Sequence, residues 1–450
     1  MTRIKNMERI VLSLVVSATL GMAATNEELY QEIQELKKEM HEMKSSQEET
    51  NETLLEEISN TSLGSQAKYE SFSSMGPAAS KVYHSKNFVS LGGYGEYKFT
   101  KYSGYKNFSS DTANDTKNKA EYNIVRFVPY IGFKFNDWIV MNTEIEFEDG
   151  GARSDNTKNY KYVIVEFSYL DFLIDESFGL RVGHILVPFG LINLNHEPVA
   201  YLTTDRPMVE TFIIPSTWHT NGLLSHGKID SFEYYAGIIT SPDAGGFTEG
   251  RYIQQGRLGA RQFTDDLSFV ARGTYDIGSG LNTGASFMYG NSTVALESKP
   301  GTSTNNVSDE TISMTMFEAH ITYKNNGFDI QALATYGALG GDIKQLSTDI
   351  GQEISKSTQG AYVTLGYDLL NNFSSEQKVY AVAEIEYLDM DVTGETSNPD
   401  NNRFNEYTAG LAYFPDPKVV LKADFKVRDY AQASNLADEK VFSMGAGFIF

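Results

Sequence analysis

Apolar and polar positions alternate along most of the chain, and residues 441–450 show the pattern most clearly. Every second position there is apolar and shares one face of an extended strand, namely Phe442, Met444, Ala446, Phe448 and Phe450. The opposite face is mostly small or polar, with Ser443, Gly445 and Gly447. One apolar face along about ten residues is typical of a strand that crosses a bilayer in a closed barrel. The alternative is the last strand of a soluble β-sandwich.

The same period of two recurs throughout residues 87–450, and it predicts sixteen strands. We expect them at 87–101, 120–135, 138–149, 160–174, 178–188, 221–229, 231–240, 267–275, 281–289, 311–324, 328–336, 358–369, 378–389, 405–413, 418–430 and 440–450. The predicted fold class is therefore an all-β transmembrane barrel of about sixteen antiparallel strands.

The connections between these strands alternate in length. Asn136 and Asp137 form a tight turn, as do residues 325–327 and 415–417, whereas residues 102–119 and 337–357 are long and polar. Short turns at one end and long loops at the other are typical of an up-and-down outer-membrane barrel. A soluble sandwich has no reason to sort its loops in this way.

The N-terminal residues follow a different pattern. Basic residues precede a short apolar run at residues 10–22, and Ala23 and Ala24 come next. This is the pattern of a secretory signal peptide over residues 1–24, cleaved after Ala23 or Ala24. The apolar run is too short for a helix that spans a membrane.

Residues 25–60 carry apolar side chains at alternating steps of four and three among many Glu and Lys residues. The seam consists of Leu29, Ile33, Leu36, Met40 and Met43. This spacing predicts an N-terminal α-helical coiled coil, because a narrow apolar seam on a solvated helix needs a partner. Residues 61–86 are rich in Ser, Gly and Ala, and we expect a flexible linker there.

Composition narrows the function classes. The chain is 12% aromatic, with 27 Tyr and 27 Phe, yet its mean hydropathy is only -0.33. A barrel accounts for both values, because half of each strand faces water and aromatic girdles mark the interfaces. A net charge of -22 argues against nucleic-acid binding. The absence of cysteine excludes disulfides and thiolate metal sites.

The longest predicted connection, residues 189–220, is rich in prolines and large apolar residues, and Pro188 leads into it. Such a composition suits a loop that folds inward and packs against the barrel wall. Here the chain resembles Gram-negative outer-membrane porins, most of all the phosphate-selective porin O/P group and coiled-coil-headed porin-like proteins. The resemblance implies a pore constriction built from the charged residues of this loop: His196, Glu197, Asp205, Arg206 and Glu210.

The same resemblance implies how the protein assembles. The terminal strand of such porins is read by the barrel-insertion machinery, so Phe448 and Phe450 are the expected assembly signal. Porins of this kind are homotrimers embedded in outer-membrane lipids. Because the first strand begins at the short-turn end, the coiled coil is expected in the periplasm.

Charged residues at inward positions of the strands are the expected pore lining. The basic ones are Arg126, Lys134, Arg181, Arg272, Lys422, Lys426 and Arg428. The acidic ones are Glu144, Glu146, Glu148, Glu166, Glu384 and Glu386. Opposed clusters of both signs produce a transverse field across a pore. The dense Arg and Lys of phosphate-selective members is not clearly present, so the resemblance does not extend to phosphate specificity.

No catalytic motif is present, so we expect no enzyme, no catalytic residues, no metal ligands and no cofactor. The favoured function is passive diffusion of small hydrophilic solutes or ions through a water-filled channel. One alternative is a substrate-specific porin for phosphate-like anions or siderophores. Another is a structural outer-membrane anchor whose coiled coil reaches toward the cell wall.

Overall fold

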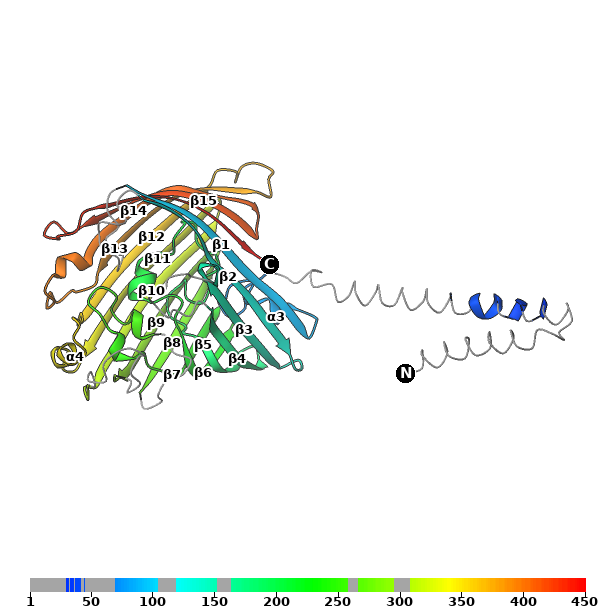
Figure 1. Cartoon of the computed structure of the whole chain (residues 1–450), viewed down its shortest axis with the longest axis horizontal. Coiled ribbons are helices and arrows are strands. Elements are labelled where there is room, and N and C mark those ends of the chain that lie inside the picture. Colours follow the sequence, from blue (N-terminus) through cyan, green and yellow to red (C-terminus); the bar gives the residue numbers. More distant parts are fainter. Residues whose placement is uncertain are drawn as a thin grey trace, which may run out of the picture. The chain divides into compact units, whose positions relative to one another are not determined.

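The computed structural model describes residues 69–103, 119–151, 163–257, 266–294 and 308–450, together with residues 30, 31, 33–35, 37–41 and 44. The chain divides into two compact units, Met1–Gln66 and Ala67–Phe450. In the first unit, the described residues are helical (Figure 1). The seam residues Ile33 and Met40 are 47% and 67% exposed. Leu29, Leu36 and Met43 lie outside the described residues, so the coiled coil stays a prediction.

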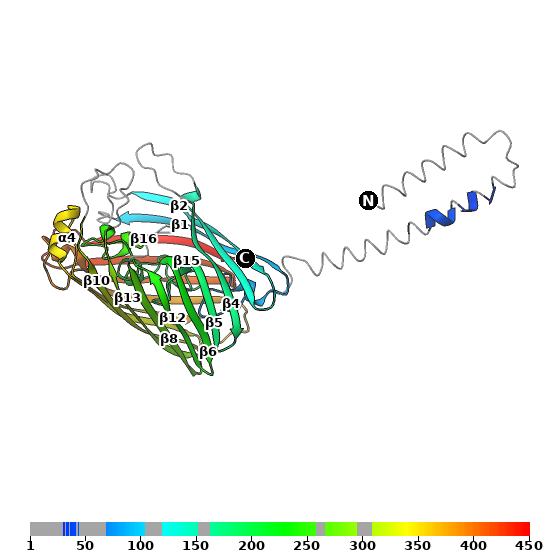
Figure 2. The same cartoon turned by 90° about the horizontal axis from the view of Figure 1, so that it is seen from below.

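The second unit is a closed antiparallel barrel of sixteen strands in which each strand pairs with its neighbours in sequence and β1 pairs with β16 (Figures 1 and 2). The strands are β1 (Val89–Ser103), β2 (Ala120–Lys134), β3 (Ile139–Glu148), β4 (Val163–Asp175), β5 (Phe178–Leu186), β6 (His219–Ile229), β7 (Phe232–Thr240), β8 (Leu267–Gly278), β9 (Leu281–Ser292), β10 (Ile312–Asn325), β11 (Phe328–Gly340), β12 (Ser357–Asp368), β13 (Lys378–Asp389), β14 (Arg403–Asp416), β15 (Val419–Tyr430) and β16 (Glu439–Ile449).

The predicted barrel and its strand number are confirmed. The ends of the strands differ from the prediction by a few residues, as at β11, where the pattern predicts an end at residue 336 and the strand ends at Gly340. Short turns such as Asp230–Ser231 and Asn326–Gly327 alternate with long connections such as residues 341–356 and 390–402. The first strand begins and the last strand ends at the short-turn edge.

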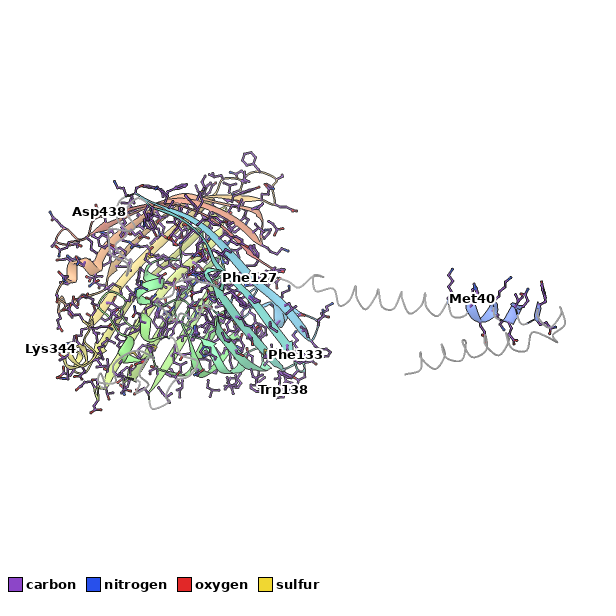
Figure 3. All side chains as sticks on the ribbon, in the orientation of Figure 1. Met40, Phe127, Phe133, Trp138, Lys344 and Asp438 are labelled. Atoms are coloured by element: carbon purple, nitrogen blue, oxygen red, sulfur yellow. The ribbon has the colours of Figure 1, made fainter. Side chains whose placement is uncertain are left out.

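The alternating sequence becomes two different faces of the barrel wall. On β13, Ile385 and Tyr387 point outward and are 58% and 36% exposed, whereas Glu384 and Glu386 point inward and are 3% and 1% exposed. Phe127 and Trp138 lie on the outside, 43% and 46% exposed (Figure 3). Closure matters because every strand then has a ladder partner on both sides, which a strand in lipid requires.

Among the described residues of the second unit, the helices are short and lie outside the strands, one before β1 and the others in the connections. They are α3 (Lys81–His84), α4 (Ile343–Ile350) and the single turns η1 (Asp149–Gly151), η2 (Val209–Ile213), η3 (Ala244–Gly246), η4 (Gln254–Gly256) and η5 (Pro399–Asn402). Among the described residues, none of the helices has the length and apolar character needed to cross a membrane.

The barrel is closed by contacts at the start of β1. The backbone N–H of Gly93 donates to the carbonyl of Phe450 at 3.0 Å, and the N–H of Phe450 donates to the carbonyl of Gly93 at 2.9 Å. The Phe450 ring stacks on Phe127 of β2, with centroids 6.0 Å apart. A Cβ at Gly93 would meet the Val128 carbonyl oxygen at 2.4 Å, so this close approach requires glycine.

Candidate functional site: the lumen and its inward loop

The connection between β5 and β6, residues 187–218, folds into the barrel, and its base is closed by one amide side chain. Asn193 Nδ2 donates to the carbonyls of Val187 and Trp218 at 2.6 and 2.9 Å, and the N–H of Trp218 donates back to Asn193 Oδ1 at 2.5 Å. Phe189 and Trp218 are fully buried, with ring centroids 6.3 Å apart. Burial of these large apolar groups holds the loop inside the barrel and away from bulk water.

The inward loop reaches across the lumen and bonds to the wall on the far side. Its partners come from β1, β12, β13 and β15: Tyr201 Oη donates to Glu96 Oε1 at 2.9 Å, the Thr204 N–H to Asp424 Oδ2 at 2.6 Å, the Val209 N–H to Glu386 Oε2 at 3.0 Å, and Tyr362 Oη to Glu210 Oε1 at 2.5 Å. The loop is therefore fixed at both of its sides. Strands distant from it in the sequence supply these partners.

One of the predicted constriction residues faces the acidic wall of β3 and β4, and a second is bonded to it. His196 Nε2 lies 3.0 Å from Glu144 Oε1 and 3.6 Å from Glu166 Oε2. Arg206 Nη2 donates to the carbonyl of His196 at 3.0 Å. On the neighbouring strand, Arg126 lies between Glu96 and Glu146, at 3.4 and 3.3 Å.

A third constriction residue, Asp205, faces lysine side chains of β1 and β15. The inward loop therefore contacts an acidic part and a basic part of the barrel wall. Asp205 lies 2.5 Å from Lys98 Nζ of β1 and 3.2 Å from Lys426 Nζ of β15. Burial acts to raise the pKa of Asp205, but the charges of Lys98 and Lys426 outweigh it and hold that pKa well below its usual range. Asp205 is therefore an anion that bridges two strands through cations.

Ion pairs between neighbouring strands continue along β14, β15 and β16. Glu406 lies 3.0 Å from Lys426 Nζ and 2.6 Å from Arg428 Nη2, and Arg428 Nη1 lies 3.6 Å from Glu439. Lys422 lies nearer the start of β15, and its Nζ is 3.7 Å from the centre of the Tyr201 ring. Alternating signs on adjacent strands let each buried charge face an opposite one, which offsets part of the cost of removing it from water.

Two adjoining cavities lie between the inward loop and the barrel wall, the larger against β1, β14, β15 and β16 and the smaller against β1 and β2. The larger, about 270 Å³, is lined by Lys98, Thr100, Tyr102, Asp205, Met208, Thr211, Phe212, Arg251, Glu406, Lys426, Arg428, Glu439 and Val441. The smaller, about 170 Å³, is lined by Glu96, Lys98, Val125, Arg126, Tyr201, Thr204, Asp205, Arg206, Met208, Thr211 and Ser216. Lys98 and Asp205 belong to both cavities, so the ion pair between them stands where the two meet.

The remaining constriction residues hold the loop in place. The Glu197 carboxylate accepts hydrogen bonds from the backbone N–H groups of Ala78 and Ala79, both at 2.9 Å. Glu210 Oε2 accepts from the N–H of Ile192 at 2.8 Å. Both carboxylates are almost completely buried.

Residues 69–86 correct one expectation. The sequence assigned them to a flexible linker, but Met75, Ala78, Ala79 and Val82 are buried against the inside of the barrel. Small residues are needed here, because a Cβ at Gly76 would meet Glu197 Oε1 at 2.3 Å. The abundance of Ser, Gly and Ala in this segment therefore reflects close packing.

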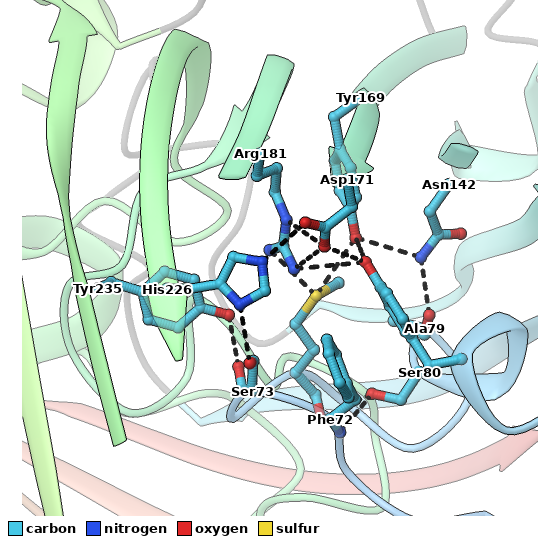
Figure 4. Close-up of polar contacts among 12 residues, drawn as sticks. Phe72, Ser73, Ala79, Ser80, Asn142, Tyr169, Asp171, Arg181, His226 and Tyr235 are labelled. Carbon is cyan, nitrogen blue, oxygen red and sulfur yellow. Dashed lines mark hydrogen bonds and ion pairs between the residues drawn. The ribbon is translucent and has the colours of Figure 1, made fainter. Parts of the chain in front are cut away.

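A buried polar network receives this N-terminal segment (Figure 4). Arg181 of β5 lies 2.8 Å from Asp171 of β4, and His226 Nε2 lies 2.7 Å from the other oxygen of Asp171. From the segment, Tyr83 Oη donates to Asp171 at 2.6 Å, and the carbonyl of Ser73 accepts from Tyr235 Oη at 2.6 Å. The segment thus completes the hydrogen bonds of charges that the wall buries.

Three of the other predicted pore-lining residues bond to groups inside the barrel. Lys134 donates to the carbonyl of Ser85 at 2.6 Å, and Arg272 donates to the carbonyl of Gly190. Glu384 accepts from Thr364 at 2.6 Å. Glu148 lies opposite Arg126 in the β2–β3 register and is half-buried. Lys134 and Arg181 contact the N-terminal segment. Of all the predicted pore-lining residues, Arg126, Lys426 and Arg428 line the two cavities and the others do not.

Several charged residues at this site were missed by the sequence analysis. They are Glu96, Lys98, Asp171, Glu406, Asp424 and Glu439. Their inward phase on β1, β4, β14, β15 and β16 was a usable signal. Parity alone does not tell which inward charge reaches the loop, because that depends on contacts between strands far apart in the sequence.

The comparisons with known proteins agree with this architecture. The sequence model of the family "Phosphate-selective porin O and P" matches residues 96–450. An uncharacterized protein of Aquifex aeolicus (strain VF5) is 30% identical over 381 residues, which cover 80% of each chain. The outer membrane channel DcaP of Acinetobacter baumannii has a similar fold, with a TM-score of 0.52 at 13% identity over 80% of this chain and 97% of that one. The chain therefore belongs to the family of phosphate-selective porins O and P, and it is an outer-membrane channel rather than an enzyme.

Proposed function

We propose that this channel passes small hydrophilic solutes and ions by diffusion between the inward loop and the wall formed by β1, β14, β15 and β16. The two adjoining cavities of about 270 and 170 Å³ support this route, because the larger lies along that wall and the smaller joins it at β1, on the side of β2. The opposite side of the loop is packed against β3 and β4 through His196. We therefore assign the selective part of the pore to the surroundings of Asp205.

The charges of the two cavities favour anions slightly. Six basic side chains line them, namely Lys98, Arg126, Arg206, Arg251, Lys426 and Arg428. Four acidic ones do so, namely Glu96, Asp205, Glu406 and Glu439. In a narrow lumen, solvent screens charges less than at an open surface, so this surplus of cations biases the local field. We expect a weak anion preference in a protein whose net charge is -22.

A substrate-specific channel for phosphate-like anions is the second candidate. The family name and the local surplus of cations favour it. Against it, Lys98, Lys426 and Arg428 each face a carboxylate already. Competition by those carboxylates weakens any binding of an anion, so we expect phosphate to pass without a strong site.

We also propose that the protein is a homotrimer whose N-terminal helices associate as a coiled coil in the periplasm. The apolar seam of residues 25–60 supports this, since Ile33 and Met40 of that seam are exposed. The expected export route runs from the signal peptide at residues 1–24 to the barrel-insertion machinery, which would read Phe448 and Phe450.

Conductance of the purified protein in planar lipid bilayers tests the channel proposal. Stepwise openings with a reversal potential displaced toward that of chloride in a KCl gradient are expected. Added phosphate should leave the chloride current nearly unchanged, whereas strong block at low phosphate concentration would favour the phosphate-specific candidate. Complete absence of conductance would contradict both and favour a structural anchor.

A further inference from the structure

Three buried side chains from three separate segments meet where the inward loop contacts the acidic wall. They are Glu144 of β3, Glu166 of β4 and His196 of the loop, and they are 0%, 1% and 2% exposed. One ligand atom from each lies within 4.8 Å of the other two. The set therefore has the size of a coordination shell and belongs to neither cavity.

The histidine ring is oriented as a ligand. His196 Nδ1 lies 3.0 Å from the carbonyl oxygen of Asn193. A carbonyl can only accept, so Nδ1 carries the hydrogen and donates it. Nε2 then faces the two carboxylates, 3.0 Å from Glu144 Oε1 and 3.6 Å from Glu166 Oε2. Metal-binding histidines are commonly held in this way, with the second ring nitrogen donating to a backbone carbonyl.

The two carboxylates are buried together, and among the described residues neither forms an ion pair with a lysine or arginine. Glu144 Oε2 is buried and has no hydrogen-bond partner. Thr217 Oγ1 donates to Glu166 Oε1, which orients that carboxylate with its other oxygen toward His196. The ion pairs of nearby Arg126 go to Glu96 and Glu146. Two adjacent buried carboxylates without a paired cation are costly unless a proton or a metal ion lies between them.

We propose that Glu144, Glu166 and His196 bind a divalent transition-metal ion of the Zn²⁺ or Mn²⁺ type. Two carboxylate oxygens and one imidazole nitrogen form a mixed set that suits these ions better than Ca²⁺ or Mg²⁺, which prefer oxygen alone. The sequence led us to expect no metal ligands, because the three residues are far apart in the chain and form no short motif. The bound ion ties the inward loop to β3 and β4, on the side away from the proposed solute route.

Titration of the full-length, detergent-folded protein with Co²⁺ tests the site. After removal of metal with EDTA, we expect saturable uptake of one Co²⁺ per chain, a visible absorption band from the bound ion, and displacement by Zn²⁺. Glu144→Gln and Glu166→Gln should each weaken binding by more than about tenfold, because each removes a charged ligand while keeping the side-chain shape.

Glu318→Gln is the matched control. Glu318 Oε2 also faces a histidine inside the barrel, His320, with 2.8 Å between Oε2 and Nδ1. Within the part of the chain that the structure describes, however, no second carboxylate converges on that pair to complete a set of three ligands. The Glu318→Gln variant should therefore bind Co²⁺ as the wild type does.

Heat-modified mobility on gels checks that every variant is folded. The absence of saturable Co²⁺ uptake by the wild type, or equal Co²⁺ uptake by all variants, would overturn the proposal. A proton shared between Glu144 and Glu166 would then be the explanation for the buried pair. The channel proposal is tested by conductance, so a failed Co²⁺ titration would not affect it.

Discussion

The Glu197 carboxylate accepts a hydrogen bond from the backbone N–H of Ala79 at 2.9 Å, and this contact joins the inward loop to the segment that precedes the barrel. The two elements inside the lumen are therefore attached to each other as well as to the wall. Movement of either one alone would leave a buried carboxylate or buried N–H groups without partners.

Glu197→Ala should free residues 69–86 from the loop and raise single-channel conductance. The two N–H groups that lose their acceptor are buried, which costs about 1–3 kcal/mol in the packed state and favours release of the segment. Glu353→Ala is the control, since Glu353 is exposed in a long connection and also accepts a backbone N–H, from Ser397 at 2.9 Å. Equal conductance of Glu197→Ala and the wild type would contradict this role of Glu197.

Arg206→Gln should move the reversal potential toward cation preference. Arg206 is one of the six basic residues of the two cavities, and its loss removes half of the local surplus of positive charge. Lys356→Gln is the control, because Lys356 lies next to β12 in a long connection and its side chain is 47% exposed. Reversal potentials in a KCl gradient give the measurement. Equal shifts for both variants would place Arg206 outside the solute route.

Removal of the inward loop, with β5 and β6 preserved, should raise conductance more than any single substitution. The loop crosses the lumen from Asn193 to its contact between Thr204 and Asp424, so its loss widens the pore over that whole distance. Single-channel recordings test this. Unaltered conductance would show that residues 187–218 do not limit flow.

Phe450→Asp should reduce insertion into the outer membrane while leaving synthesis and secretion unchanged. The Phe450 ring packs on Phe127 at the seam between the first and last strands, and an aspartate there would place a charge at the lipid-facing surface. Phe373→Asp is the control, because Phe373 lies in a turn and is 69% exposed. Unchanged outer-membrane amounts of Phe450→Asp would contradict the assembly-signal prediction.

Arg181→Met should destabilise the barrel by about 3–5 kcal/mol, since it leaves Asp171 buried without its principal cation. The pair Lys324–Asp329 has a similar distance of 2.6 Å, but the Lys324 side chain is 65% exposed. Lys324→Met should therefore cost about 1 kcal/mol or less. Unfolding in urea, followed by gel mobility, compares the two. Similar losses would mean that Arg181 does not stabilise the network.

Ile33→Asp combined with Met40→Asp should convert a trimer into smaller species, because the charges would fall in the proposed apolar seam. Gln34→Asp with His41→Asp places the same charges one residue away, outside the seam. Light scattering of the detergent-extracted protein gives the mass. A wild-type mass below three chains would contradict the trimer itself.

The sequence by itself determined the barrel. A strand of this barrel presents one face to lipid and the other to water. Apolar and polar residues therefore alternate along it, as Ile385 and Glu386 do. The alternation of short and long connections along the chain determined which end of the barrel carries the short turns. The composition of residues 189–220 determined that this loop turns inward, since apolar residues such as Phe189 and Trp218 need burial.

Only the tertiary structure decided what the inward charges do. Glu144, Glu166 and His196 meet because β3, β4 and the loop converge in space, and no local spacing records that. The same holds for Asp205 between Lys98 and Lys426. Residues 69–86 were assigned to a linker because Ser, Gly and Ala are common in flexible segments. Their small size instead lets Gly76 and Ala79 approach the Glu197 carboxylate, and a close approach depends on the partner as much as on the segment.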